Sequence, residues 1–352
     1  MIEGWTSGNN DVDKFIKDTI YDARNDTITK FLEWVPFDRF KDINQIGVGG
    51  FAKVYSATWI DGKAESTSQD DLSWKKKEPQ PTKVALKRLN RSQNMSAEYL
   101  NELKIHWNFY KSISFTSLNF YGMTKDPVTE EFMTILRLVD KGNLGSVLSH
   151  NFNNNLWEDK IKYLQWIAYG LNKLHELGYF YKDFHSGNIL LHNTSTYISD
   201  FGLSGLSNKQ KSDDKIYIYS FGIIMTELSS GKPPFYDRKH DLSLALGICN
   251  VLRPEFGIGT PEIYKKLVYK CVNANSNQRP TANELYNILN SWFLFFRGYE
   301  GKDIKTAFEE ADEKIPYIST SYEKNPDAIY TSRLEVASSL QLKGDVSNEF
   351  VE

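Results

Sequence analysis

Cysteine, net charge and long apolar runs are all scarce in this sequence of 352 residues. Two cysteines, Cys249 and Cys271, are too few for a disulfide framework and are typical of a reducing compartment. No apolar run approaches the roughly 20 residues that a membrane-spanning helix needs. Charged side chains among the first 20 residues exclude the apolar core of a signal peptide. We therefore expect a soluble, cytoplasmic protein without a membrane span.

The net charge is also small, −3 at pH 7. Binding nucleic acid phosphates needs a basic surface, so this balance argues against nucleic acid as the main partner. What the sequence does have is apolar material: hydrophobic residues make up 40% of it, enough for the core of one large domain or two smaller ones.

Strand patterns dominate the first part of the chain and helical patterns the second. Apolar alternation and short apolar runs predict strands within 43–60, at 84–86 and at 134–136, whereas the polar stretch 61–82 is expected to be a long hairpin loop. The expected helices are 96–110 with Ser96 as N-cap, 161–174, 218–228 buried on all sides, 262–272 and 281–296. This distribution favours an α+β fold with a small sheet-rich lobe and a larger helical lobe.

A glycine-rich stretch, Gly47–Val54, is the first motif with chemical meaning. Glycine lets a backbone turn sharply and approach phosphate groups closely. The flanking Ile46 and Val54 place the stretch between two strands. A glycine cluster alone is more often an ordinary hairpin turn. Ala52 stands where a third glycine is expected, a mild departure.

The second motif is Val84–Lys87, in which a lysine ends a buried strand. Such a lysine can direct its ammonium group at nucleotide phosphates while a carboxylate orients it. Glu102 on the next predicted helix is the expected partner, and Glu98 one turn earlier is the alternative. A lone lysine at a strand end is more often simply exposed.

Two further motifs, Tyr181–Leu191 and Ile198–Gly202, supply carboxylates and an amide. Asp183 and Asn188 lie five residues apart on one loop, and Asp200 follows a short strand. This set suits phosphoryl transfer, because one carboxylate accepts the proton of the attacking hydroxyl while the other and the amide hold metal ions at the phosphates. Both motifs at this separation seldom arise by chance.

Together these motifs resemble a eukaryotic protein kinase of the tyrosine-kinase-like branch. The resemblance implies a two-lobed fold with a small antiparallel-sheet N-lobe carrying one main helix, a larger helical C-lobe, ATP and Mg²⁺ as cofactors, and a protein substrate. The implied division of the chain is an N-terminal extension over 1–39, a kinase domain over 40–296 (N-lobe 40–138, C-lobe 141–296) and a C-terminal tail over 297–352, partly helical at 303–313.

The same resemblance implies a role for individual residues. Asp183 is the catalytic base, Lys87 contacts the phosphates and pairs with Glu102, and Asn188 and Asp200 are metal ligands. Leu136 is the implied gatekeeper and Leu138–Asp140 the hinge that receives the adenine. The implied nucleotide-binding residues are Ile46, Gly47, Gly49, Gly50, Val54, Ala85, Lys87, Leu136, Leu138, Val139 and Leu190.

Kinases of small molecules, of the aminoglycoside and choline type, share the pattern of Asp183, His185 and Asn188. Three features favour a protein kinase instead. They are the spacing of Phe51 and Val54 in the glycine-rich stretch, the apolar helix Ile218–Met225, and Arg279 within Asn277–Thr281.

The sequence departs from the family pattern in and after the catalytic loop. Tyr181 and Lys182 replace the expected histidine and arginine, and lysine lacks the bidentate fork of arginine. Ser220 lies only 20 positions after Asp200, about half the usual length of this stretch, and no Ala-Pro-Glu motif is present. The gap falls between Lys215 and Ile218, as a skipped exon would leave it.

Two consequences are expected from this shortened activation segment. Tyr217 replaces an aspartate that braces the catalytic loop, and Arg279 is left as an unpaired buried charge. Removing one partner of a buried ion pair costs about 3–5 kcal/mol. The nucleotide residues are untouched, so the sequence predicts ATP binding with weak transfer to proteins.

The leading interpretation is a protein Ser/Thr or Tyr kinase. The alternatives are an ATP-binding pseudokinase or scaffold, and an incomplete product of an active kinase. The sequence does not predict the oligomeric state.

Overall fold

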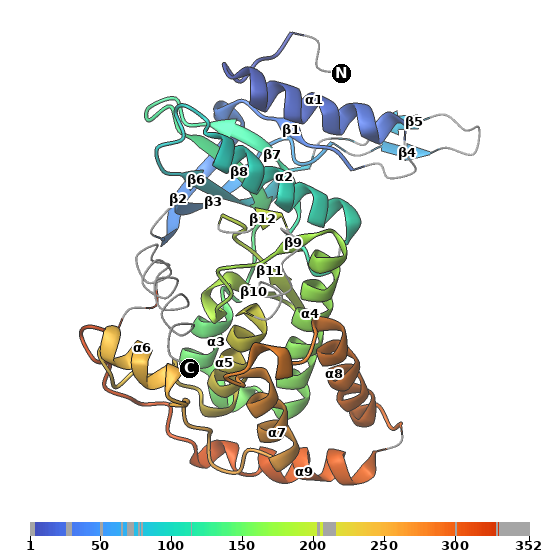
Figure 1. Cartoon of the computed structure of the whole chain (residues 1–352). Helices are drawn as coiled ribbons and strands as arrows, with labels where there is room; N and C mark the ends of the chain where they lie inside the picture. Colours follow the sequence, from blue (N-terminus) through green and yellow to red (C-terminus); the bar gives the residue numbers. More distant parts are fainter. Residues whose placement is uncertain are drawn as a thin grey trace, which may run out of the picture.

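Two lobes make up the protein, a sheet-containing lobe around β2 and β7 and a helical lobe around α4 and α5 (Figure 1). The predicted two-lobed α+β fold is therefore confirmed. The computed structural model describes residues 4–25, 30–49, 52–64, 66–68, 74–76, 78, 80–113, 115–202, 205–206, 216–299, 301–328 and 330.

A six-stranded sheet in the order β1-β7-β8-β6-β3-β2 builds the N-lobe. The strands are β1 (Glu33–Trp34), β2 (Phe40–Val48), β3 (Ala52–Trp59), β6 (Thr82–Leu89), β7 (Phe120–Lys125) and β8 (Phe132–Arg137). The predicted antiparallel sheet needs one correction, because β1 pairs parallel to β7. This edge strand comes from the segment before Phe40, where no strand was expected. Within 61–82 the predicted loop carries a small hairpin, β4 (Ser66–Ser68) and β5 (Trp74–Lys76).

The central strand β6 explains why Val84–Leu86 is a continuous apolar run. It pairs with β3 on one side and β8 on the other, and Val84, Ala85 and Leu86 are all buried. A strand covered on both faces has no exposed positions to fill with polar residues. Lys87 follows in the same strand, opposite Val54 and Thr134.

Two helices pack beside the N-lobe sheet (Figure 1). In α2 (Ala97–Ser112), Ser96 accepts a hydrogen bond from the Tyr99 amide, as the predicted N-cap should. The other helix, α1 (Asn10–Asn25), buries Val12, Phe15 and Ile16 in the cluster that contains Leu103 and Trp107 of α2. The N-terminal extension is thus packed against α2 and the sheet.

The C-lobe is built from helices with two short antiparallel strand pairs. The helices are α3 (Leu144–Asn151), α4 (Trp157–Glu176), α5 (Ile216–Ser230), α6 (Leu242–Cys249), α7 (Glu262–Cys271), α8 (Ala282–Phe296) and α9 (Lys302–Asp312). The paired strands are β10 (Ile189–His192) with β11 (Ser195–Ile198), and β9 (Tyr179–Phe180) with β12 (Gly205–Leu206). Short 3-10 turns occur at Phe37–Arg39, Phe152–Asn154, Ser186–Asn188, Ser276–Gln278 and Ile315–Tyr317.

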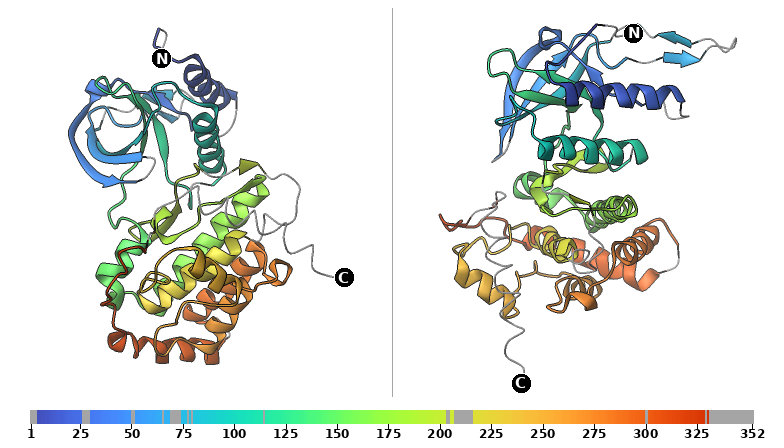
Figure 2. Two further views of the ribbon diagram at one scale, coloured as in Figure 1. Left: turned by 60° about the vertical axis from the view of Figure 1, so that its left-hand side comes forward. Right: turned by 45° about the horizontal axis from the view of Figure 1, so that its top comes forward.

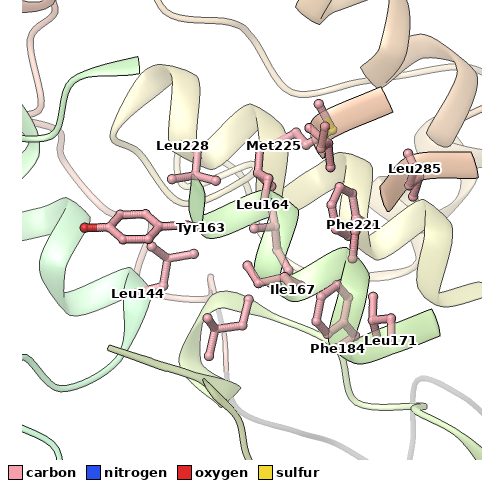
Figure 3. Packing of buried hydrophobic residues seen from close by; sticks show 14 of the residues in the cluster. Leu144, Tyr163, Leu164, Ile167, Leu171, Phe184, Phe221, Met225, Leu228 and Leu285 are labelled. Atoms are coloured by element: carbon pink, nitrogen blue, oxygen red, sulfur yellow. The ribbon is translucent and has the colours of Figure 1, made fainter. Parts of the chain in front are cut away.

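The C-lobe core lies between α4 and α5. Leu164, Ile167 and Leu171 of α4 lie near Phe221 and Met225 of α5 in one apolar layer (Figure 3). The predicted burial of α5 on all sides is confirmed. Its Gly222 permits the close approach of α7, because a Cβ there would lie 2.8 Å from the Cβ of Cys271.

The chain after residue 296 continues to pack on the C-lobe. Phe308 of α9 is fully buried, with its ring 5.5 Å from those of Trp157 and Trp292. The predicted partial helix at 303–313 is confirmed by α9. In the described part of the chain, none of the helices combines the length and apolar character needed to traverse a bilayer.

Candidate nucleotide and phosphotransfer site

Lys87 lies at the centre of a cluster of charged groups contributed by both lobes. Its Nζ lies 3.1 Å from Oε1 of Glu102 on α2 and 3.1 Å from Oδ1 of Asp200. Glu98, the alternative partner, is exposed. One ammonium group thus joins the N-lobe sheet, the N-lobe helix and the segment after β11.

Burial and charge act in opposite directions on this cluster. Burial alone would lower the pKa of Lys87, but the attraction of Glu102 and Asp200 outweighs it and raises the pKa above its ordinary value. Burial raises the pKa of Glu102, and the ammonium of Lys87 opposes that shift. Lys87 therefore stays charged near neutral pH and can attract the anionic phosphates of a nucleotide.

Asp200 occupies a strained position. Its φ is +64°, in the left-handed region that non-glycine residues seldom adopt. The neighbouring Gly202 allows this arrangement, because a Cβ there would press on Oε2 of Glu102 at 3.1 Å. The Asp-Phe-Gly sequence thus turns its carboxylate towards Lys87.

A column of aromatic rings holds this segment in place. The ring of Phe201 lies 5.3 Å from that of His106 on α2 and 5.7 Å from that of Tyr181, and His106 stacks on Phe120 of β7 at 5.0 Å. Burial lowers the pKa of His106 to about 4, so its ring is neutral at physiological pH. The column runs from the N-lobe sheet to the loop that carries Asp183, where Tyr181 stands at the position for which the resemblance implies a histidine.

The catalytic loop, Tyr181–Asn188, is held by hydrogen bonds between Asp183 and Asn188. The side-chain amide of Asn188 donates to the backbone carbonyl of Asp183 at 3.0 Å and to Oδ2 of Asp183 at 3.3 Å. The Ser199 amide in turn donates to the Asn188 carbonyl at 2.9 Å. Because β10 and β11 pair with Ile189 opposite Ile198, Asn188 and Asp200 emerge from the same end of the hairpin. The structure therefore brings the loop of Asp183 and the segment of Asp200 together.

The donor set fits Mg²⁺ bound jointly with a nucleotide. In the part of the chain that the structure describes, no three His, Cys, Asp or Glu side chains gather to hold a metal ion. The nearby oxygens are the half-exposed carboxylate of Asp200 and the amide of Asn188. Mg²⁺ usually takes one or two protein oxygens together with substrate phosphates and water, so this sparse set is suitable.

The predicted adenine-binding residues gather in one apolar cluster. Ala85 and Leu136 are buried members of it, and four others pack against it, namely Val54, Leu138, Val139 and Leu190. Ile46 does not join them and is 55% exposed. Gly47 lies in β2 opposite Val54, and Gly49 follows β2 in the turn to β3, where its amide donates to the Ala52 carbonyl. Gly50 lies outside the described residues.

The predicted hinge connects the lobes through backbone and side-chain contacts. It follows β8, and Asp140 lies 3.1 Å from Nδ1 of His192 on β10 and accepts a bond from the Asn193 amide. Lys141 and Gly142 exchange backbone hydrogen bonds with Leu191. The predicted hinge, which contributes Leu138 and Val139 to the apolar cluster, is thus held against β10 of the C-lobe.

One structural consequence expected from the shortened segment, the unpaired Arg279, is wrong. The Nε of Arg279 donates to the Asn273 carbonyl at 2.8 Å, and its guanidinium lies over the Tyr219 ring at 5.3 Å, so it has partners. Tyr217 is buried, and its hydroxyl lies 2.9 Å from Nδ1 of His175 on α4, so the expected loss of a brace at this position stays a prediction. The shortened stretch itself, 207–215, lies outside the described residues.

The catalytic loop is instead braced by a residue that the motifs did not identify. Ser186 Oγ donates to Oε1 of Glu227 on α5 at 2.9 Å. Burial raises the pKa of Glu227 to about 7, although the Ser186 bond and His185 oppose the shift. The signal in the sequence was a lone acid within a helix that was predicted to be buried on all sides.

A two-lobed fold with this lysine–glutamate pair, Asp-Phe-Gly segment and catalytic loop defines a protein kinase. The family described as protein tyrosine and serine/threonine kinase matches residues 40–217, half of the chain, and the chain belongs to it.

Proteins similar to this chain are also named as protein kinases. A probable serine/threonine-protein kinase of Dictyostelium discoideum is 29% identical over 44% of this chain and 11% of its own length. A putative serine/threonine-protein kinase/receptor of Acanthamoeba polyphaga mimivirus is 25% identical over 73% of this chain and 16% of its own length. The dual specificity protein kinase pyk3 of Dictyostelium discoideum is 25% identical over 74% of this chain and 19% of its own length. The chain thus spans a small part of these relatives.

Proposed function

We propose that this chain is an ATP- and Mg²⁺-dependent protein kinase domain of the tyrosine-kinase-like branch, with slow transfer to separate protein substrates. The observation that carries the proposal is the Lys87–Glu102–Asp200 cluster beside the ordered loop of Asp183 and Asn188. Because the relatives are named serine/threonine or dual-specificity kinases, serine and threonine hydroxyls are the proposed acceptors.

Each residue has one proposed task. Lys87, held by Glu102, binds the α- and β-phosphates. The oxygen of the substrate hydroxyl bonds to the γ-phosphorus while the bond from that phosphorus to the departing ADP breaks. Asp183 accepts the proton that the hydroxyl loses. Mg²⁺, when bound at Asp200 and Asn188, neutralises phosphate charge. The apolar cluster around Ala85 and Leu136 receives the adenine.

The short stretch from Asp200 to Ser220 supports slow transfer to proteins. It lacks the Ala-Pro-Glu motif and the segment that aligns a peptide, and alignment supplies much of the rate in phosphoryl transfer. The same observation favours a second candidate function, an ATP-binding pseudokinase. Both cysteines are free, which agrees with the proposed cytoplasmic location.

The first test is stabilisation by nucleotide. ATP with Mg²⁺ at about 100 times its dissociation constant should add roughly 2.7 kcal/mol to the free energy of unfolding. A melting temperature that does not move with nucleotide contradicts the proposal. Asp183→Asn is the matched variant, since it should retain the stabilisation.

The second test separates kinase from pseudokinase. Incorporation of labelled phosphate into a generic protein substrate should be slow but measurable, and Asp183→Asn should abolish it. Stabilisation by ATP with no transfer above the Asp183→Asn background would instead establish the pseudokinase. Sequencing transcripts across the codons for Lys215–Ile218 tests whether this chain is an incomplete product, since an intervening coding block would show a longer parent kinase.

A further inference from the structure

The helix α6 presents an apolar face that the described part of the chain leaves uncovered. None of its residues is buried, although its sequence contains three leucines and an isoleucine. Leu242 is 58% exposed and Leu246 41% exposed, and Val251 just beyond the helix is 68% exposed. Positions 242, 246 and 249 are spaced by four and three residues, so Leu242, Leu246 and Cys249 share one side of the helix. Exposed apolar groups gathered on one element are typical of a contact surface.

A cavity of about 700 Å³ adjoins this helix. Leu244, Gly247 and Leu252 line it together with the loop before α6, and Asn325 from the C-terminal segment also lines it. The surface around α6 is therefore already shared with the C-terminal part of the chain.

The chain after α9 returns to α6 and is held there (Figures 1 and 2). The Asn325 amide donates to the Tyr236 carbonyl at 2.8 Å, and the His240 amide donates to the Asp327 carbonyl at 3.2 Å. Tyr330 donates its hydroxyl to the Pro234 carbonyl at 2.9 Å. The Tyr330 ring also lies 4.9 Å from that of His240. The last described residue is thus fixed beside the segment that leads into α6.

We infer that residues 331–352 of this chain cover the face formed by Leu242, Leu246 and Cys249. The segment starts at the held Tyr330, so it is tethered next to that face at high effective concentration. Its 22 residues span up to about 70 Å when extended, whereas α6 is about 12 Å long, so reach does not limit the contact.

The sequence of the segment suits this role. Between 334 and 342 the leucines and valine, Leu334, Val336, Leu340 and Leu342, all occupy even-numbered positions, and the odd-numbered positions from 335 to 343 carry Glu, Ala, Ser, Gln and Lys. In an extended conformation the even positions lie on one side of the backbone, which gives an apolar strip opposite a mostly polar one. An apolar strip tethered beside an uncovered apolar face favours contact within the chain over capture of another protein.

Cys249 provides a native reporter for this contact. It is exposed on the same side of α6 as Leu242 and Leu246, whereas Cys271 is fully buried and burial raises its pKa. A thiol reagent added to the full chain therefore reports on Cys249. We expect alkylation to be about tenfold slower in the full chain than in a chain ending after Tyr330.

Point variants keep the test independent of truncation. Leu340→Asp with Leu342→Asp in the full chain should restore fast alkylation. Ser339→Asp with Gln341→Asp adds the same charge on the polar strip and should preserve protection. The free peptide 331–352 should slow alkylation of the truncated chain. These readouts need no nucleotide, so they are distinct from the test of kinase function.

Two results would overturn the inference. Equal alkylation rates in the full and truncated chains would show that the segment does not cover α6. Protection that survives truncation and increases with protein concentration would assign the face to a second copy of the chain.

Discussion

Lys87, which is partly buried, and Lys160, which is fully buried, lie one in each lobe, and their surroundings differ. Lys87 has carboxylate oxygens of Glu102 and Asp200 at 3.1 Å each. Lys160 of α4 is fully buried, and its Nζ has no hydrogen-bond partner in the described part of the chain. The rings of Phe152 and Trp157 lie 4.1 and 4.9 Å from that Nζ.

The electrostatic result is opposite in the two cases. The carboxylates raise the pKa of Lys87, whereas burial lowers the pKa of Lys160 to about 7, although the charge of Asp312 opposes this. Burial disfavours a charged amine unless a carboxylate compensates. The comparison separates a lysine that two carboxylates keep charged from one that packs among aromatic rings and readily becomes neutral.

The largest expected effect is on catalysis. Lys87→Met should lower the rate of phosphate transfer at least about 100-fold, since a charge that stabilises the transferring phosphates is lost. Lys160→Met should leave the rate within about twofold, because Lys160 packs against the rings of Phe152 and Trp157 and has no proposed task in phosphate transfer. Initial rates of labelled phosphate incorporation measure both variants. Equal losses in the two would mean that Lys87 acts only through folding.

The second effect is on the free energy of unfolding, which the two substitutions should change in opposite directions. Lys160→Met should raise the free energy of unfolding at pH 7 by about 1–3 kcal/mol, because it replaces a buried amine that lacks a hydrogen-bond partner. Lys87→Met should lower the free energy of unfolding by about 1–3 kcal/mol, since Glu102 and Asp200 lose their cation. The loss should be smaller than for a fully buried ion pair, because Asp200 is half-exposed. Urea unfolding measures both. Destabilisation by Lys160→Met would show that the amine is compensated.

Lys87 and Lys160 also differ in whether their surroundings could be predicted from the sequence. Lys87, Glu102, Asp183, Asn188 and Asp200 belong to motifs whose spacing reflects one chemical task, so their proximity could be predicted. Local periodicity likewise predicted α2, α5, α7 and α8.

Features that depend on distant packing could not be predicted in this way. The predicted helix began at residue 161, so Lys160 lay just outside it and its burial was not predicted. Its burial depends on α9: Asp312 accepts a hydrogen bond from the Trp157 amide at 2.7 Å across 155 residues of sequence. The parallel β1 and the Ser186–Glu227 brace were missed for the same reason, since each joins segments that no local pattern links.

The third prediction concerns pH. Between about pH 7 and 10.5 the unfolded chain keeps a proton on Lys160 that the folded chain lacks, so this residue makes stability rise with pH, by about 1 kcal/mol per unit. Lys87 contributes no such slope below pH 10, because its pKa is raised in the folded state. Unfolding free energies at pH 7.5, 8.5 and 9.5 should lose this rise in Lys160→Met. The partly exposed Lys162→Met is the matched control and should keep the rise.

The smallest effect comes from the acid next to Lys160. Asp312→Asn keeps an oxygen that can accept the Trp157 amide bond but removes the negative charge that supports the ammonium form of Lys160. The pKa of Lys160 should therefore fall further, and the rise of stability with pH should begin at a lower pH. The stability at pH 8 should change by less than about 1 kcal/mol, since Lys160 is already mostly neutral there and the helix cap is retained. Unfolding curves from pH 6 to 9 measure the shift. A rise that begins at a higher pH in Asp312→Asn would mean that Asp312 does not act on Lys160 through its charge.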